Sequence, residues 1–418
     1  MSLISISQSL TYIFLFIALY FEVFVLVTYF ENHQHIKKDS VSPVFEPKRY
    51  PTVSIIVPCW NEESTLDKTI NSLLTLNYPK DKLSILIVDD GSTDNTWHAM
   101  QKFTDHPTVR IFKKENGGKH TALNFGLEQS NSELVGCLDA DSYVDREALK
   151  NIILYFEQDP DAMVVTPSIK IWQPKNMIQL IQAVEYSWAI FLRKMLAFVG
   201  AMYVTPGPFS IFKREVFHSI GTYKEAHKTE DMEIAMRMQS RRMKIANCHN
   251  AFVYTSAPET LPKLYKQRLR WTYGFIQNSI DYRFMFFKRD YGNLGLFVLP
   301  IACLSILTTM YAAGTVVWSW MSRTVDEIVR IQTVGLHFPL WQFSFDWFSF
   351  NTGFITIASF AALLGMLTIV FLSRGMARDE KRFGLDLIYF LAFYSFIAPL
   401  WLGKALYNTI FSVTTNWR

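Results

Sequence analysis

Two hydrophobic patterns divide this chain. Long apolar runs with few charges occupy both ends, whereas apolar and polar residues alternate over short distances between about Lys48 and Lys288. A helix that crosses a membrane needs roughly 20 mostly apolar residues. The segments that meet this requirement are Tyr12 to Phe30, Leu294 to Trp318, Gly353 to Ser373, and Leu387 to Ile410. The pattern predicts a globular domain held at a membrane by about four spanning helices.

Basic residues indicate the orientation of these spans, because Lys and Arg gather in cytoplasmic loops. One cluster follows the first span and the other lies between the last two: Lys37, Lys38, Lys48 and Arg49, then Arg374, Arg378, Lys381 and Arg382. Placing both inside predicts a multi-pass plasma-membrane protein with a cytoplasmic central domain. We expect an anchor and linker (1–48), a cytosolic domain (49–260), interfacial helices (261–293) and a membrane domain with three spans (294–418).

The central domain alternates short β-branched runs with helical periodicity. The expected strands are Val53 to Val57, Leu83 to Val88, Val109 to Phe112 and Leu134 to Leu138. We expect Pro58 to stop the first strand and Ser64 to cap the helix that follows it. Ser92 or Thr93 is expected to start the helix that contains Trp97. Strands that alternate with helices predict an α/β fold with a doubly wound, mainly parallel sheet.

The composition of the chain argues against only one class of function, nucleic-acid binding. Lys and Arg number 41 and Asp and Glu 37, so the net charge is +4, too small to argue for nucleic-acid binding. Some basic residues are expected to face anionic lipid headgroups. The apolar, aromatic segment Met177 to Val204 contains Glu185, Arg193 and Lys194, and we therefore expect it to lie along the membrane surface as an amphipathic helix.

An aspartate pair suggests a metal site. Asp139 and Asp141 are two residues apart at the end of the fourth expected strand. Ligands of parallel sheets bind beyond the carboxyl ends of the strands. Two aspartates there can share a hard cation such as Mg²⁺ or Mn²⁺ together with substrate phosphates. The alternative is an ordinary solvated turn, in which Asp is common.

A nucleotide site is expected at the same edge of the sheet. Asp89 and Asp90 close the second strand, and a carboxylate there can accept a hydrogen bond from a uracil imide or a ribose hydroxyl. Both residues also suit a plain turn. In the loop 58–62, Pro58, Trp60 and Glu62 are donor-side candidates. Trp60 is able to stack on a base, or it is simply part of the core.

Two further pieces supply charge. Lys119 follows two glycines at the start of a helix, and a cation there suits a diphosphate. The spacing is not that of a P-loop. Glu230 and Asp231 open another helix, where acidic residues are ordinary complements to the helix dipole. An inverting transfer to a hydroxyl needs a positioned carboxylate to accept a proton, and Asp231 is the best candidate, with Glu230 second.

A basic-aromatic pentad precedes the second span: Gln267, Arg268, Leu269, Arg270 and Trp271. Its simplest interpretation is an interfacial amphipathic helix. In a functional interpretation, Arg270 binds the leaving diphosphate, because guanidinium matches phosphate oxygens in a bidentate way. Trp271 then offers an aromatic platform for the apolar face of an acceptor sugar.

The order of these motifs resembles the processive family 2 glycosyltransferases, which include cellulose, chitin, hyaluronan and poly-N-acetylglucosamine synthases. The resemblance covers roughly Val53 to Gly274 and the flanking membrane helices. The compact length, the single leading span and the QRLRW pentad are most similar to the poly-β-1,6-N-acetylglucosamine synthase branch. Chitin-oligosaccharide and hyaluronan synthases are close behind.

The resemblance implies a GT-A fold, a UDP-sugar donor, Mg²⁺ or Mn²⁺, and inversion to a β-linkage. It implies uridine binding by Asp90, metal and donor binding by Asp139 and Asp141, and proton acceptance by Asp231. Gating and acceptor binding would fall to the loop that begins at Gly207 and to the pentad residues Gln267, Arg268, Arg270 and Trp271.

The implied activity is that of a hexosyltransferase that polymerises sugar, with UDP-N-acetylglucosamine as the expected donor, into an exported polysaccharide. The alternative is a non-processive transferase that acts on a polyprenyl phosphate or another lipid. The expected partners are the donor, the growing polysaccharide and membrane lipids. A small membrane accessory subunit stays open as a further partner, and no nucleic acid is expected.

Overall fold

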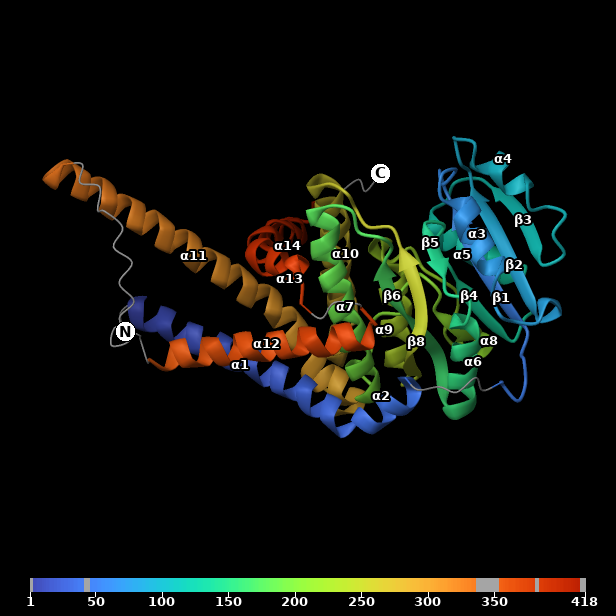
Figure 1. Ribbon diagram of the computed structural model, residues 1–418, viewed down its shortest axis with the longest axis horizontal. Helices are drawn as coiled ribbons and strands as arrows, with labels where there is room; N and C mark the ends of the chain where they lie inside the picture. Colours follow the sequence, from blue (N-terminus) through green and yellow to red (C-terminus); the bar gives the residue numbers. More distant parts are fainter. Residues whose placement is uncertain (1–2, 41–45, 336–352, 380–382, 414–418) are drawn as a thin grey trace.

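A computed structural model describes residues 3–40, 46–335, 353–379 and 383–413. At its centre is one eight-stranded sheet with the order β3-β2-β1-β4-β7-β6-β8-β5. The strands are β1 Val53–Cys59, β2 Leu83–Asp90, β3 Val109–Lys114, β4 Leu134–Cys137, β5 Ser142–Val144, β6 Ala162–Ile171, β7 Ile211–Lys213 and β8 Lys244–Thr255. Figure 1 shows this sheet at one end of the molecule and the long apolar helices at the other.

The predicted parallel half of the sheet is confirmed. β1 lies between β2 and β4, β3 flanks β2, and all three pairings are parallel. Pro58 does not stop β1, which continues to Cys59. β1 pairs with β4 only as far as Ile56, so beyond that point it bonds β2 alone, and an edge position tolerates a proline without an N–H. β4 ends at Cys137, one residue earlier than expected.

The other half of the sheet is mixed. β7 is antiparallel to both β4 and β6, and β5 is antiparallel to β8. β6 and β8 run parallel with two register shifts. The whole sheet is therefore mixed but mostly parallel, which agrees with the expected α/β class.

Helices cover both faces of the sheet. Those of the sheet domain are α3 Leu66–Leu74, α4 Thr96–Gln101, α5 Lys119–Glu128, α6 Ala148–Gln158, α8 Arg214–Ile220 and α9 Glu230–Ser240. Ser64 does not cap α3. Thr65 holds the N-cap position without a side-chain cap, because a preceding turn already lets the N–H groups of Thr65 and Leu66 donate to the Glu62 carbonyl.

α4 also starts later than the sequence suggested. Its first residue is Thr96, so neither Ser92 nor Thr93 begins it. Both N–H groups are already used: that of Ser92 donates to Asp89 and that of Thr93 to Asn61. Contacts with the loops at the strand ends therefore fix residues 92–93 in a non-helical conformation, and the helix begins only at Thr96.

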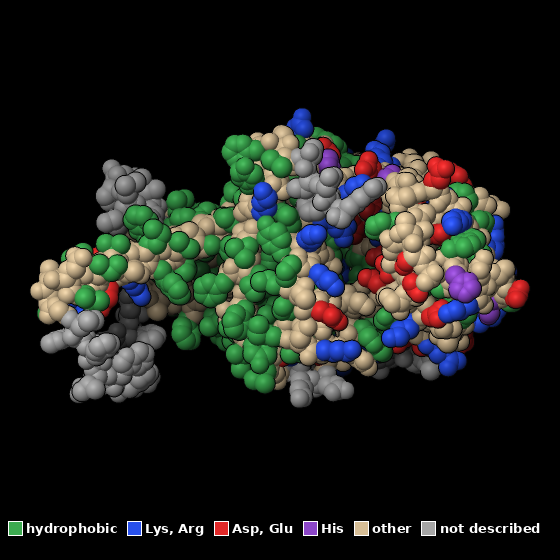
Figure 2. All heavy atoms as spheres, turned by 90° about the horizontal axis from the view of Figure 1, so that it is seen from above, with side chains coloured by type: hydrophobic (Ala, Val, Ile, Leu, Met, Phe, Trp, Pro, Cys, Tyr) green, Lys and Arg blue, Asp and Glu red, His purple; other side chains and the backbone are tan. Residues whose placement is uncertain are grey.

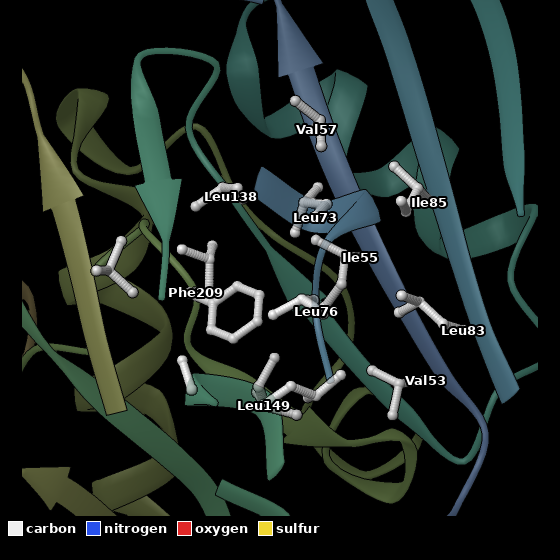
Figure 3. Close-up of a cluster of buried hydrophobic side chains, with 14 of the residues drawn as sticks. Val53, Ile55, Val57, Leu73, Leu76, Leu83, Ile85, Leu138, Leu149 and Phe209 are labelled. Carbon is white, nitrogen blue, oxygen red and sulfur yellow. The ribbon is translucent and has the colours of Figure 1, made fainter. Parts of the chain in front are cut away.

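Alternation along the strands builds two cores. Val53, Ile55 and Val57 of β1 point to one face, beneath α3 and α6, while Ile56 points to the other. Figure 3 shows the first core, where the Phe209 ring lies among side chains of several elements. Since every second residue of a strand faces the same way, the sheet fixes which strand-end residues share a face.

Two helices stand between the sheet and the membrane helices, α7 Met177–Phe198 and α10 Leu261–Asp281 (Figure 1). α7 packs on β6 and β8 on one side and on α12 on the other. It ends at Phe198, six residues before the expected Val204, and residues 199–204 belong to the loop that follows it. α10 packs on α14 through Leu269 and Trp401.

Within the described ranges, four helices are long and apolar enough to cross a membrane, in agreement with the predicted number: Gln8–Glu31, Leu294–Val334, Phe354–Met376 and Leu385–Ile410. The elements that contain them are α1 Leu3–Glu31, α11 Leu299–Val334, α12 Phe354–Met376, α13 Leu385–Tyr389 and α14 Ser395–Ile410, and α2 His33–Ser40 follows α1. In Figure 2 apolar side chains gather on this part and charged ones on the sheet domain. Lys381 and Arg382 lie outside the described residues.

Candidate functional site

The strand-end aspartates lie at one edge of the sheet, where β1, β2 and β4 end side by side. Asp89 and Asp90 are both buried, and each holds a neighbouring loop. The Asp90 carboxylate pairs with Lys114 at 2.7 Å and accepts the N–H groups of Gly117 at 3.1 Å and Gly118 at 2.8 Å. Asp89 Oδ1 accepts the Ser92 N–H at 2.9 Å, while its buried Oδ2 has no hydrogen-bond partner among the described residues.

Lys119 joins the metal-site candidates to the base candidates. It begins α5, and its ammonium lies 2.7 Å from Asp139 Oδ1 and 3.0 Å from Glu230 Oε1. Burial acts to lower the pKa of Lys119, but the carboxylates of Asp139 and Glu230 outweigh it and raise the pKa well above its ordinary value. The ammonium is therefore a fixed positive charge at the centre of an acidic cleft.

Gly207 closes one wall of this cleft. A Cβ at this position would lie 2.9 Å from the Lys119 ammonium and 3.1 Å from Asp139 Oδ2, so any side chain would disturb the pair. The Cys137 thiol donates to the Gly207 carbonyl at 2.8 Å and holds the loop in place. The predicted acceptor loop thus touches the donor-side residues directly.

The chemistry of Asp139 and Asp141 suits a divalent cation. Burial, followed by the carboxylates of Asp139 and Glu62, raises the pKa of Asp141 to about 7. The Asp139 charge acts on the Asp141 carboxyl, and a cation bound by both would offset this repulsion. No group of three His, Cys, Asp or Glu side chains that could hold a metal occurs in the described ranges. Two carboxylates are thus only part of a coordination shell, and substrate phosphates would have to supply further ligands for Mg²⁺ or Mn²⁺.

The turn that carries the base candidates is held from several sides. Its preceding residues 226–228 have left-handed φ angles of 42°, 53° and 65°, a strained backbone of the kind that is often found at functional sites. Arg270 of α10 donates to the Lys228 carbonyl at 2.9 Å. Thr205 donates to the Asp231 carbonyl through its N–H at 3.1 Å and its hydroxyl at 2.9 Å.

The environments of Glu230 and Asp231 differ. Burial acts to raise the pKa of Glu230, but the Lys119 ammonium outweighs it and lowers that pKa. Burial and then the Glu230 carboxylate raise the pKa of Asp231 to about 6. Since Glu230 is bound to Lys119, Asp231 stays the better candidate of the two for a proton acceptor.

The two arginines of the pentad contact different parts of the protein. Arg270 faces the turn that carries Glu230 and Asp231, and its charge acts to lower the pKa of both carboxyls, although burial and Glu230 still raise that of Asp231. Arg268 is buried and turned away from that turn: it pairs with Glu185 of α7 at 2.8 Å and lies 4.3 Å from the centre of the Trp271 ring. Its other donor bonds Gln267 at 2.8 Å.

Two sequence-based expectations change in the structure, and one residue of this region was missed. Trp60 is 46% exposed, so its interpretation as a core residue is wrong and the stacking role stays a prediction. Arg268 is committed to an ion pair rather than free for an acceptor. The partner Glu185 was noted in the sequence only as an interruption of an apolar helix, and that charge was the available signal for its role.

Comparisons with known proteins agree with this geometry. Residues 54–221 match the model of the family described as Glycosyl transferase family 2. The chain is 28% identical over 321 residues to a poly-β-1,6-N-acetyl-D-glucosamine synthase of Staphylococcus epidermidis, covering 76% of each chain. It is 32% identical over 224 residues to the protein of the same name in Staphylococcus aureus strain COL, covering 53% of this chain and 54% of the relative.

A solved structure shares the fold. The mannosyltransferase PcManGT from Pyrobaculum calidifontis, in complex with GDP-Man and Mn²⁺, superposes with a TM-score of 0.57 at 17% identity, covering 96% of this chain and 100% of that one. Identity this low speaks for the fold alone, which is of the GT-A type. Over residues 54–221, which make up most of the sheet domain, the chain matches the glycosyltransferases of family 2.

Proposed function

We propose that this protein is a membrane-embedded, inverting β-glycosyltransferase that polymerises sugar from a UDP-sugar, UDP-N-acetylglucosamine above all, into an exported polysaccharide. The observation that carries the proposal is the double contact of Lys119, which brings donor-side Asp139 and the acceptor-side turn of Glu230 into one cleft. Relatives named poly-β-1,6-N-acetyl-D-glucosamine synthase support the choice of sugar.

The donor would bind at the carboxyl edge of the sheet. Asp89 and Asp90, with Pro58, Trp60 and Glu62 on the adjoining loop, would receive the nucleoside. Asp139 and Asp141 would hold Mg²⁺ or Mn²⁺, which neutralises charge on the diphosphate when bound. The Mn²⁺ in the structure of PcManGT is in keeping with this expectation. Lys119 and Arg270 would face the same phosphates as fixed cations.

Transfer would then need one proton acceptor. Asp231 would take the proton from the acceptor hydroxyl, whose oxygen attacks the anomeric carbon from the side opposite the diphosphate. The bond from that carbon to the diphosphate oxygen breaks, and UDP leaves with its negative charge offset by Lys119 and Arg270. One attack from the opposite side gives inversion at the anomeric carbon.

The position of α10 supports elongation at the membrane. Leu269 of α10 packs on Ala398, Trp401 and Ala405 of α14, so the helix that carries Trp271 lies directly against the membrane bundle. The basic residues Arg374 and Arg378 lie at the end of α12 beside the sheet domain, where Arg378 covers the Phe252 ring at 5.3 Å. Both features suit a cytoplasmic catalytic domain that passes its product towards the bundle.

The test is UDP release by the purified full-length protein in detergent or lipid discs, with several UDP-sugars offered in parallel. We expect turnover with UDP-N-acetylglucosamine and a product ladder. Asp231→Asn should bind UDP as the wild type does and lose turnover by about a hundredfold or more, because Asn cannot accept the proton.

Two outcomes would redirect the proposal. Wild-type turnover in Asp231→Asn would move the base to Glu230. A single sugar added to a polyprenyl phosphate or another lipid, without a ladder, would favour the non-processive alternative, which leaves the pentad without an evident role.

A further inference from the structure

A cavity of about 700 Å³ lies where the sheet domain meets the membrane helices, and the proposed reaction makes no use of it. The ends of β6 and β8, one face of α7, the segment at the end of α12 and the start of α13 form its walls. One candidate span, Phe354–Met376, ends beside it, and another, Leu385–Ile410, begins there. The cavity therefore lies at the membrane surface, on the side of the sheet domain.

Two ion pairs connect the walls of this cavity. Lys170 at the end of β6 pairs at 2.9 Å with Asp379, the residue that follows α12 closely in the chain. Asp379 also accepts a hydrogen bond from the Ser187 hydroxyl of α7 at 2.8 Å. Arg374 of α12 is buried and pairs with Asp386 of α13. The shape of the cavity is thus fixed by contacts between the sheet domain and the membrane helices.

Arg378 supplies a third positive charge to the cavity. It is exposed and has a left-handed φ of 54°, a conformation that residues other than glycine seldom adopt. Its guanidinium lies 5.3 Å from the centre of the Phe252 ring and donates to Asn250 Oδ1 at 3.4 Å. In the part of the chain that the structure describes, no carboxylate pairs with it. Two cations of the cavity are therefore neutralised by carboxylates, and one positive charge is left.

This charge balance selects the chemistry of a ligand. A phosphodiester carries one negative charge, which is the amount that Arg378 leaves uncompensated. Guanidinium also matches phosphate oxygens in a bidentate way. A cationic headgroup would instead meet two carboxylates that are already paired, those of Asp379 and Asp386. The cavity therefore suits a singly charged phosphodiester better than a cation.

Apolar side chains continue from the cavity along the membrane helices. Leu385 lines the cavity and is exposed, and Phe371 lies about one turn before Arg374 on the same face of α12. The exposed ring of Phe383 stacks on Phe371 with centroids 5.7 Å apart. Trp172 is exposed at the cavity, and tryptophan is typical of the headgroup level of a membrane. A charged cavity with an apolar flank fits an amphiphile better than a soluble ion.

We propose that this cavity binds the headgroup of a phospholipid with one net negative charge, of the phosphatidylglycerol type. Arg378 would bind the phosphate, and the acyl chains would follow Phe371 and Leu385 along the membrane helices. Attraction of anionic lipid to basic residues is general at membrane surfaces. The proposal is more specific, because it assigns one lipid to one cavity that is shared by the sheet domain and the membrane helices. It goes beyond the proposed function and does not depend on which sugar is transferred.

The experiment measures lipid binding without turnover. The purified full-length protein in detergent is mixed with small amounts of phosphatidylglycerol or phosphatidylcholine, and bound lipid is quantified by native mass spectrometry. We expect the wild type to bind phosphatidylglycerol about tenfold more tightly, the lower end of what one hydrogen bond between charged groups contributes. Arg378→Asn should remove this preference. Asn suits the test because it adopts left-handed φ angles more readily than most residues.

Controls separate the cavity from general surface charge. Arg289→Asn is the matched variant, because Arg289 is exposed shortly before the second candidate span and does not line the cavity. It should change the affinity by less than about twofold, since little lipid in detergent forms no charged surface. UDP binding shows that each variant has folded. If Arg378→Asn fails this check, Arg378→Lys replaces it and should still weaken phosphatidylglycerol binding several-fold, because an ammonium lacks the planar fork.

Three outcomes would overturn the assignment. The first is an equal loss of affinity in Arg378→Asn and Arg289→Asn, and the second is equal binding of both lipids by the wild type. The third is displacement of phosphatidylglycerol by millimolar glycerol phosphate, which would make the ligand a soluble phosphate. Each leaves the proposed function standing, because that function is tested by UDP release and not by lipid binding.

Discussion

Gly274 of α10 packs against Thr229, the residue that opens the turn of Glu230 and Asp231. A Cβ at position 274 would lie 2.4 Å from both Oγ1 and Cγ2 of Thr229, whereas ordinary contacts begin at 3.4 Å. Gly274→Ala therefore has to move α10 and the turn apart by about 1 Å, the difference between these two distances. Asn278 of α10 also donates a hydrogen bond to the Thr229 hydroxyl at 2.9 Å. A shift of α10 would therefore disturb the turn through this bond as well.

Two effects of opposite sign act on stability. Alanine favours the helix over glycine by about 1 kcal/mol. Overpacking a filled contact costs about 1–3 kcal/mol. Their difference is a net destabilisation of about 0–2 kcal/mol. Misplacing a catalytic group by about 1 Å costs about a hundredfold in rate. Activity should therefore fall far more than stability.

The assay is UDP release beside the thermal unfolding midpoint of the same preparation. Gly314→Ala is the matched control, because a Cβ there meets nothing within 4 Å and only helix propensity changes. Adding Thr229→Ala to Gly274→Ala removes the clashing atoms and should restore part of the turnover. Wild-type turnover in Gly274→Ala would refute the claim that this contact positions the Asp231 turn.

Three other predictions concern the cleft. Asp141→Asn should lose most turnover and weaken nucleotide binding, and full activity in excess EDTA would rule out the metal role. Since the pKa of Asp231 is raised to about 6 and a base must be deprotonated, kcat/KM should fall about tenfold for each pH unit below 6 and level off above 7; equal rates at pH 5 and pH 7 would contradict this. Trp271→Ala should keep UDP binding but abolish polymer, whereas polymer of normal length at a normal rate would leave the residue as a membrane anchor only.

Local pattern was enough to place the acidic residues. Val53 to Val57 and Leu83 to Val88 have the β-branched, apolar composition of buried strands, and parallel pairing puts their carboxyl ends at one edge. The convergence of Asp89 with the segment of Asp139 follows from that rule alone. The apolar lengths likewise sufficed for the four spans.

Long-range pairing accounts for what the sequence did not reveal. The strands β6, β7 and β8 pair with strands that are far away in the sequence. β7 runs antiparallel to β4 and β6, so the regular alternation of strand and helix that marks parallel pairs does not predict it. The direction of Arg268 was equally hidden, because only the packed position of α7 brings Glu185 to it. Loop contacts, such as those of Ser92 with Asp89, override capping preferences that a local pattern suggests.

The length of α11 has a mechanical consequence. With the short π-helical turn that precedes it, the helix covers Leu294–Val334, 41 residues, or about 60 Å at 1.5 Å per residue. The hydrocarbon core of a bilayer measures about 30 Å. Even at a tilt of about 40°, the upper end for spanning helices, the helix would rise about 15 Å beyond the hydrocarbon core, measured along the membrane normal.

The two ends of α11 differ in exposure. Leu294 and Leu299 are buried in the core shared with the sheet domain, whereas Val325 and Val334 are exposed and Arg323 lies on the same outer stretch. In Figure 1 α11 extends past the ends of α1 and α12. With the proposed cytoplasmic sheet domain, α11 would be a stiff spacer whose tip holds a bound molecule clear of the lipid surface, on the face where the proposed polymer would leave the cell.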